Sequence, residues 1–395
     1  MRHQRLAIYY PSALCLSLML ARGDCAAIVP SDLINLPVLP LAASSIIAEN
    51  SSTSEADRLF QEARKLLSEG TAESLRAAIQ KFEAALPLYQ AAGNMARVAI
   101  VWDKIGYIYN TLGEKQRALD YYNQALPLRR QMGDKSGEAA TLHGMGNVYS
   151  DLGDLETALS YYKQALPLRR ELGDKNGEAK TLSGIARAYS DLGDKQTALS
   201  YYNQALLLFR EVGDKRGEAG TLHGMGWVYS DLGDKQTALD HFNQALVLRR
   251  EVGDQRGEAA TLNIMGQLYS SLGDYQTARF YFNQSLPLRQ KMGDKRGEAI
   301  TLSDMGWLDF DSGDHQTALS HFNQSLLLFE QVGDKKGQAR TLTSLGLVYD
   351  NLGNKQKALD YYNQALPLSQ QVGDKSYALL TSFLTSLALT VEMSL

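Results

Sequence analysis

The chain has 395 residues, with 40 Lys and Arg against 44 Asp and Glu and a formal net charge of -4 at pH 7. This balance, without a basic stripe that recurs along the chain, excludes nucleic acid as an expected partner. The two cysteines, Cys15 and Cys25, lie near the N-terminus. The sequence beyond them can therefore hold no disulfide, no thiolate metal site and no cysteine nucleophile.

Residues 1–53 are expected to form a leader and a linker. Two arginines precede an apolar run over residues 6–21, and small residues follow as far as Ala27, which is the order of parts in a cleaved export signal. We therefore expect an exported or periplasmic protein whose mature chain begins near Ala27. The alternative is a cytoplasmic protein, and contact with a membrane is expected only through an uncleaved leader.

Residues 54–93 are expected to form a divergent helix pair, and residues 94–373 a series of regular ones. In the second region one block of sequence recurs every 40 residues, seven times. Within one copy, apolar residues are spaced three and four apart over 139–152 and again over 158–168, which is typical of one face of each of two helices. Gly153 should end the first helix in the left-handed conformation, and Asp154 should cap the second.

A repeat of this length predicts a solenoid, in which each unit buries its apolar face against its neighbours. The fold class expected is therefore all-α, with about eight antiparallel helix pairs. Residues 374–395 should form one further helix, either a cap or a truncated end. Four copies carry proline inside the second helix where others carry Leu or Val, and we expect that helix to continue with a local kink: Pro127, Pro167, Pro287 and Pro367.

The landmarks of each copy resemble those of the tetratricopeptide repeat, and the 40-residue period resembles its longer subclass, found in cell-polarity adaptors and in bacterial arrays that precede a caspase-like domain. The resemblance implies a right-handed superhelix whose first helices line a concave groove, and a role in protein–protein interaction. In one copy the matching residues are Leu142, Met145, Gly146, Tyr149, Gly153, Ala158, Tyr162 and Ala165.

One position varies between copies while its neighbours barely change, and in tetratricopeptide arrays the corresponding position faces the groove. Because Trp, Tyr and Arg dominate binding energies, we expect this column to anchor a peptide or a partner's helix; the alternative is drift at an exposed position. The column consists of Tyr107, Asn147, Arg187, Trp227, Gln267, Trp307 and Leu347. A neighbouring polar column, which includes His143, His223 and Asn263, should contact the backbone of the ligand.

Neither an enzyme nor a cofactor is expected. His143 and His223 lie two repeats apart, much farther than two ligands of one metal ion, so no metal site is expected. We predict a noncatalytic scaffold that binds a protein or peptide in its groove. The alternative is the sensor or regulatory half of a caspase-like protease system whose catalytic domain is lost or separate.

One copy departs from the pattern at Asp309, where the others carry Tyr. A carboxylate between helices must find a partner, stay hydrated or shift its pKa, each at a cost. The repeat over 298–330 is therefore expected to be the weakest, and Asp309→Tyr to stabilise it.

Overall fold

The computed structural model describes residues 41–392, so the predicted leader up to residue 40 lies outside the described residues. These residues form seventeen helices and no strand. The helix predicted to begin at Ser54 begins at Leu41. The helices are α1 (Leu41–Glu69), α2 (Ala72–Ala91), α3 (Met95–Thr111), α4 (Lys115–Gln131), α5 (Lys135–Leu152), α6 (Leu155–Glu171), α7 (Lys175–Asp191), α8 (Lys195–Val212), α9 (Lys215–Asp231), α10 (Lys235–Glu251), α11 (Gln255–Ser271), α12 (Tyr275–Lys291), α13 (Lys295–Asp311), α14 (His315–Gln331), α15 (Lys335–Asn351), α16 (Lys355–Gln371) and α17 (Lys375–Glu392).

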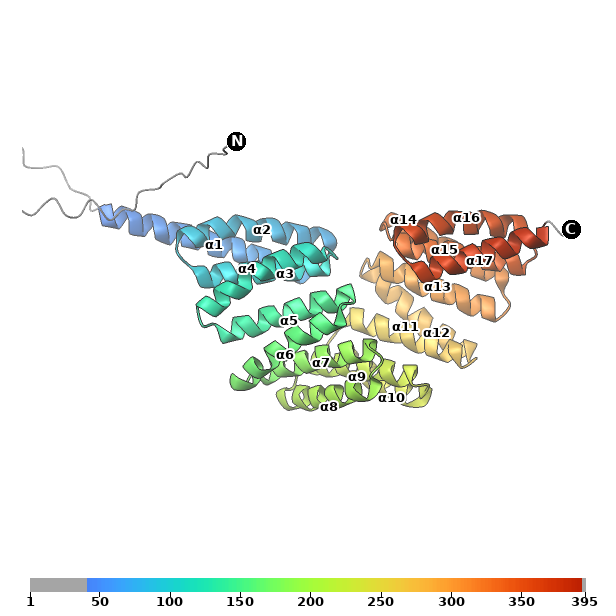
Figure 1. Ribbon diagram of the computed structural model, residues 1–395, viewed down its shortest axis with the longest axis horizontal. Helices are drawn as coiled ribbons and strands as arrows, with labels where there is room; N and C mark the ends of the chain where they lie inside the picture. The colour runs from blue at the N-terminus through green and yellow to red at the C-terminus, as the bar shows by residue number, and fades with distance from the viewer. Residues whose placement is uncertain (1–40, 393–395) are drawn as a thin grey trace, which may run out of the picture. The chain divides into compact units, whose positions relative to one another are not determined.

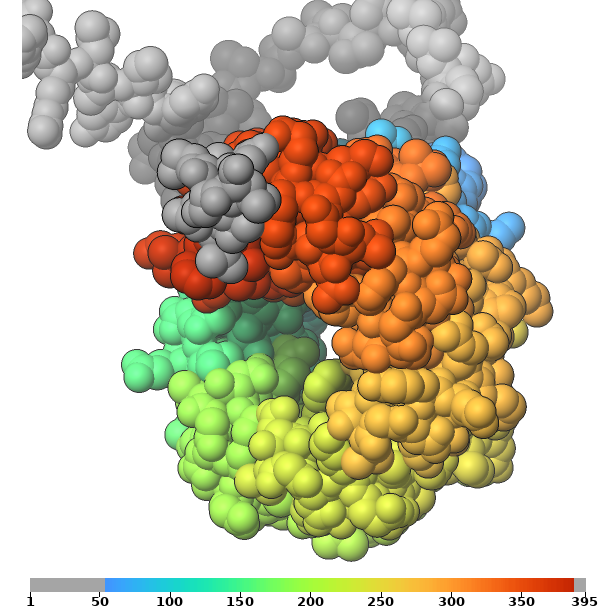
Figure 2. Space-filling model, turned by 90° about the vertical axis from the view of Figure 1, so that its right-hand side faces the viewer, coloured from blue at the N-terminus to red at the C-terminus, as the bar shows by residue number. Residues whose placement is uncertain are grey.

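Helices α1 to α16 form eight consecutive pairs, and α17 packs against α15 and α16 (Figure 1). First helices of neighbouring pairs touch one another, as α5 touches α7 and α13 touches α15, whereas second helices of neighbouring pairs make no comparable contact within the described part of the chain. The first helices therefore form the inner face of the stack. Figure 2 shows the pairs following one another in chain order from green through yellow to orange. The all-α superhelical solenoid of helix pairs is confirmed.

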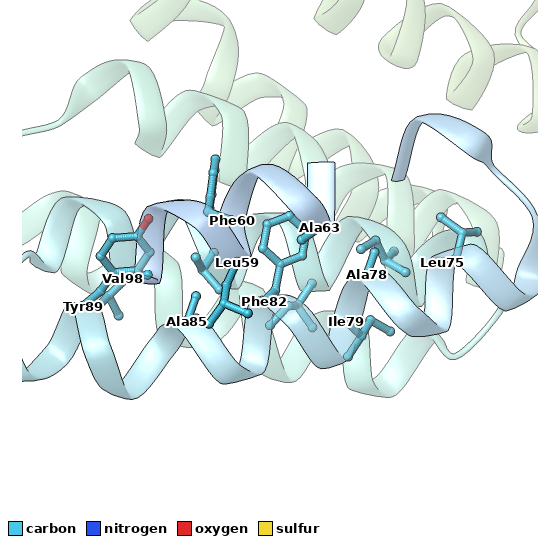
Figure 3. Close-up of a cluster of buried hydrophobic side chains, with 14 residues drawn as sticks. Leu59, Phe60, Ala63, Leu75, Ala78, Ile79, Phe82, Ala85, Tyr89 and Val98 are labelled. Atoms are coloured by element: carbon cyan, nitrogen blue, oxygen red, sulfur yellow. The ribbon is translucent and has the colours of Figure 1, made fainter. Parts of the chain in front are cut away.

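The divergent first pair has a packed core of its own (Figure 3). The rings of Phe60 on α1 and Phe82 on α2 meet edge to face with centroids 5.4 Å apart, and Ala78 and Ala85 are fully buried. This pair therefore begins the hydrophobic core that the regular pairs continue.

Most turns between helices are capped as the sequence predicted, although Glu114 before α4 makes no side-chain cap hydrogen bond. Gly153 has φ 81°, in the left-handed region that favours glycine, and the Asp154 carboxylate accepts a hydrogen bond from the Thr157 N–H at 3.2 Å. In the regular pairs the second helices that contain proline, α4, α6, α12 and α16, continue through it, as α2 does through Pro87; the local kink stays a prediction.

An aromatic ring from each second helix lies between two first helices. A Cβ at Gly146, on the first helix of the same pair, would lie 2.5 Å from the ring of Tyr162, and a Cβ at Gly184, on the next first helix, would lie 2.9 Å from it. Contacts this short do not occur between real atoms, so both positions need glycine while the ring stays in place. The close packing of the array explains why glycine recurs here.

Asp309 is buried between helices and has found polar partners, which is one of the three outcomes that the sequence analysis gave for it. Its side chain is 0% exposed; Oδ1 accepts from Arg279 Nη2 at 2.5 Å, and Oδ2 lies 2.6 Å from His321 Nδ1. At the same place in another pair, Tyr149 and Tyr161 stack with centroids 5.4 Å apart. The stack is replaced by a paired carboxylate, so a tyrosine at 309 alone would leave two polar partners without it, and the stabilisation expected from Asp309→Tyr stays a prediction.

Candidate ligand-binding groove

The variable column lies on the first helices, with every member at least partly open to solvent. Tyr107 is 54% and Trp227 is 42% exposed, Arg187 is also exposed, and the other four members are half-buried. Exposed aromatic side chains on the inner face of a helical array are the kind of anchor that dominates binding energies.

Both tryptophans of the column are held by a phenylalanine of the same pair. Trp227 meets Phe242 edge to face at 6.4 Å, and Trp307 meets Phe322 at 5.5 Å in the same manner. A third ring, Phe310, packs edge to face on Trp307 at 5.6 Å. Edge-to-face contacts of this kind stabilise the position of each ring.

Two pockets open on this face. The α7 pocket, between α5, α7 and α9, encloses about 320 Å³, and the α13 pocket, between α11, α13, α15 and α17, encloses about 520 Å³. The α7 pocket is lined by polar and aromatic residues that include His143, Asn147, Lys180, Arg187, Tyr202 and Phe209. Residues lining the α13 pocket include Gln267, Arg296, Asp304, Trp307, Lys336 and Arg340.

Five of the residues predicted from the sequence therefore come together in two groups. Asn147 and Arg187 share the α7 pocket with His143, while Gln267 and Trp307 share the α13 pocket. The other predicted residues line neither pocket: Tyr107, Trp227, Leu347, His223 and Asn263.

In the α7 pocket the predicted residues are tied to neighbouring side chains. Asn147 Oδ1 accepts a hydrogen bond from the Tyr162 hydroxyl at 2.7 Å, and Arg187 donates to Ser150 Oγ at 3.2 Å. The Arg187 guanidinium also lies 3.5 Å from the Asp151 carboxylate. This pocket has cationic lining residues and no carboxylate among them.

The polar column makes contacts between repeats. His143 Nδ1 lies 3.5 Å from Thr181 Oγ1, and His223 Nδ1 lies 3.4 Å from Thr261 Oγ1. Burial lowers the pKa of His143 to about 4 and that of His223 to about 3, so both rings are neutral at pH 7. Contact of these two rings with a ligand stays a prediction. Among the described residues no group of three or more His, Cys, Asp or Glu is placed to hold a metal ion.

Asn263 was expected to face the ligand, and its position requires a correction. Its side chain is 3% exposed, and Nδ2 donates to Asp304 Oδ2 at 2.7 Å. Asn263 therefore positions another groove residue instead of forming the groove surface, because a buried amide offers a ligand no surface to touch.

Asp304 is the groove residue that the sequence analysis missed. Its carboxylate accepts hydrogen bonds at Oδ2 from Asn263 Nδ2 at 2.7 Å and from Gln267 Nε2 at 2.8 Å. Burial raises the pKa of Asp304 to about 6. The signal was present in the repeat, because three earlier copies carry glycine at this position: Gly144, Gly184 and Gly224.

The aromatic residue of the preceding second helix explains this change. A Cβ at Gly224 would lie 2.6 Å from both Cζ and the hydroxyl oxygen of Tyr202, so the tyrosine ring in this position excludes a side chain there. Where the second helix carries tyrosine, the next first helix carries glycine in three pairs, Tyr122 with Gly144, Tyr162 with Gly184 and Tyr202 with Gly224, whereas Tyr362 of the last pair is followed by Leu384 on α17. Where the second helix carries phenylalanine, the next first helix carries a residue larger than glycine: Phe82 with Lys104, Phe242 with Ile264, Phe282 with Asp304, and Phe322 with Ser344.

The family comparison matches the larger part of the array. The model described as tetratricopeptide repeat matches residues 137–211, 196–251, 238–291 and 292–371. A second model, that of the soluble NSF attachment protein, matches residues 41–167. A search of curated proteins found no match. Within residues 41–392, none of the helices has the length and apolar character needed to span a bilayer.

Several solved structures share this fold. The signal transduction ATPase with a tetratricopeptide repeat sensor, PH0952 from Pyrococcus horikoshii, is 15% identical, with a TM-score of 0.63 over 86% of this chain and 50% of that one. A Rap protein complexed with Competence and Sporulation Factor is 14% identical, with a TM-score of 0.57 over 82% and 99%. The apo form of RapI is 17% identical, with a TM-score of 0.55 over 71% and 99%. At such identities the likeness concerns the fold alone.

Proposed function

Because the chain belongs to the tetratricopeptide repeat family, we propose that it is a noncatalytic scaffold that binds a peptide segment of a partner protein along its first helices. The proposal rests on the rings of Trp227 and Trp307. Both are partly exposed on the inner face, and a phenylalanine of the same pair packs against each of them. Rigid aromatic side chains supply binding area at little cost in conformational entropy. The Rap protein complex supports the view that an array of this fold can carry a ligand.

The test begins with peptides selected from a random library against the full chain. Replacing Trp227 and Trp307 together by Ala should weaken their binding, because truncating an anchor of this kind costs about 2 kcal/mol or more. Each anchor would then contribute a factor of about 30 in Kd. Affinity is measured by fluorescence anisotropy, and circular dichroism checks that the helices remain.

A matched control uses apolar residues on the second helices. Leu207 and Leu327 are 67% and 55% exposed, so their joint replacement by Ala removes comparable exposed apolar surface away from the groove. This variant should bind the peptides as tightly as the wild type. Equal binding by the double tryptophan variant, or a loss in the leucine variant alone, would place the ligand elsewhere.

The alternative function, as the sensor half of a caspase-like protease system, stays a prediction. PH0952 supports the general idea of such an array acting as the sensor of a larger signalling protein. Export through the predicted leader also stays a prediction, and mass spectrometry of the mature N-terminus in the native host tests it.

A further inference from the structure

We propose that the α13 pocket binds a cationic side chain of the peptide, the guanidinium of an arginine or the ammonium of a lysine, with the carboxylate of Asp304 as its partner and the ring of Trp307 beside it. This inference rests on the proposed function and adds the chemistry that one part of the groove selects. The pocket is large enough for such a side chain, at about 520 Å³.

Asp304 is the carboxylate of this pocket that has no cationic partner among the described residues. Asp334, the other acidic residue of the lining, accepts from Arg296 Nε at 2.7 Å. The remaining cations of the lining, Lys336 and Arg340, lie 3.4 and 3.1 Å from the carboxylate of Asp374. Every cation of the pocket lining is thus engaged with another carboxylate. Arg289, outside the lining, favours the ionised form of Asp304 by its charge and makes no ion pair with it among the described residues, so the pocket face of Asp304 can accept a cation from a ligand.

The hydrogen bonds to Asp304 are arranged so that one oxygen stays available. Both amide donors, from Asn263 and Gln267, reach Oδ2, and the described side chains offer no donor to Oδ1. A half-buried carboxylate without a countercharge is costly to keep ionised. A bound guanidinium or ammonium would supply both the missing countercharge and the missing donor.

Trp307 lies one turn after Asp304 on α13, and residues three apart share one face of a helix. Its ring is fixed by Phe310 and Phe322, as described above. A cation near a tryptophan ring gains further stabilisation, and arginine can pair with a carboxylate while it stacks on an aromatic ring. The chain already uses this contact on the far wall of the pocket, where Arg340 lies 4.9 Å from the centre of the Tyr377 ring.

The same selectivity is absent from the α7 pocket. Gly184 and Gly224 stand where Asp304 stands, because Tyr162 and Tyr202 fill the space that a side chain would need. The two pockets of one groove are therefore expected to prefer different parts of the ligand, and the position of a basic residue in the peptide would set its register on the array.

The experiment uses three small probes on the full chain: N-acetyl-argininamide, its uncharged isostere N-acetyl-citrullinamide, and N-acetyl-glutamate amide. Saturation-transfer NMR titration should show saturable binding of the arginine probe and about tenfold weaker binding of the citrulline probe. Asp304→Asn keeps the shape and removes the charge, so it should abolish the difference between these two probes. Asp304→Ser, which introduces the residue that the next copy carries at Ser344, is a second variant with the same expectation.

Measuring the affinity for the arginine probe while the pH is lowered from 7.5 to 5 provides an independent test. Burial raises the pKa of Asp304 to about 6, so its protonation should weaken binding of the arginine probe over this range, and the effect should vanish in Asp304→Asn. The pKa of Asp334 lies below its usual value, because burial, which raises it, is outweighed by the Gly337 N–H and by Arg296.

Equal binding of the arginine and citrulline probes, or no saturable binding of the arginine probe, overturns the inference. Preference for the glutamate probe, lost in Arg296→Gln, also overturns it and assigns the pocket to an anion instead. If Asp304→Asn changes nothing while the double tryptophan variant still loses the selected peptides, the pocket inference fails and the proposed function stands. If the reverse holds, the pocket binds a cation and the proposed role of the tryptophans fails.

Discussion

Helices α5 to α9 and helices α11 to α15 follow one sequence template, yet they build different groove surfaces. In the first region a tyrosine such as Tyr202 excludes any side chain at Gly224 on the next first helix. In the second region Phe282 leaves room for Asp304, which enters the α13 pocket. The space that a buried aromatic ring occupies therefore decides whether the groove can carry a charged side chain on the next first helix.

The two regions also differ in the polar groups that they bury. The first contains His143 and His223, which burial keeps neutral. The second contains two carboxylates: Asp304 has amide partners and no cation, and Asp309 pairs with Arg279 and His321. The two carboxylates of the second region are thus paired or open to the groove, while the two histidines of the first region are neutral.

The largest expected effect is at Asp309, where the second region departs most from the template. Asp309→Ala should lower the free energy of unfolding by about 2 kcal/mol or more, because it leaves Arg279 and His321 without their carboxylate. Replacing all three residues by the array's usual ones, Arg279→Leu, Asp309→Tyr and His321→Tyr together, should be neutral or stabilising. Urea denaturation measures the free energy of unfolding of the single and the triple variant.

Asp311→Ala serves as the control for that series, since Asp311 lies two residues away on the exposed side of α13; its effect should stay within about 0.5 kcal/mol. A single Asp309→Tyr change that raises the urea midpoint would contradict the view that the three residues act as a unit.

The next effect tests whether an aromatic ring on a second helix of the first region excludes a side chain from the next first helix. Gly224→Ile introduces the residue that the following copy carries, and it should cost about 1–3 kcal/mol because the new Cβ overlaps both Cζ and the hydroxyl oxygen of Tyr202. In a Tyr202→Phe background the cost should be smaller, with a coupling of about 0.5–3 kcal/mol in the double-mutant cycle. Equal costs in both backgrounds would show that the hydroxyl is not what excludes the side chain.

The reverse exchange on α10, between the two regions, should have a smaller effect. Phe242→Tyr adds the hydroxyl opposite Ile264 and should lower stability by about 1 kcal/mol through overpacking. Adding Ile264→Gly recreates the arrangement of the first region. Because this removes the steric overlap, the double variant should regain the stability that the overlap cost. The measurement is the thermal midpoint of the single and double variants, and a Phe242→Tyr variant as stable as the wild type would limit this exclusion to the first region.

The smallest expected effect is a difference in pH dependence. The folded pKa values of His143 and His223 lie below the unfolded value, so the unfolded state binds more protons between about pH 6.5 and 4 and stability falls as the pH falls. The folded pKa of Asp304 lies above its unfolded value, so its contribution has the opposite sign between about pH 6 and 4.

Urea midpoints at pH 7 and pH 5 test these signs. From pH 7 to pH 5 the wild type should lose stability relative to His223→Gln and gain it relative to Asp304→Asn. Parallel pH profiles for the wild type and either variant would contradict the corresponding assignment.

The sequence alone determined the fold, because its signals are local. Apolar spacing of three and four defines a helix, and Gly153 and Asp154 end one helix and begin the next through contacts within a few residues. Repetition of these signals predicted the pairs and their order, and the matching family model covers the same repeats. The groove residues at Asn147 and Trp307 could also be found, because they vary within an otherwise constant copy.

The tertiary structure decided what the buried polar residues do. Asp309 meets Arg279 from the preceding pair, Asn263 turns inward to hold Asp304, and Thr181 on the next first helix contacts His143. Each of these contacts joins residues 30 to 41 positions apart. Their geometry depends on which side chains fill the space between neighbouring helices, and no local pattern encodes that, because the same helix forms whether the facing ring carries a hydroxyl or not.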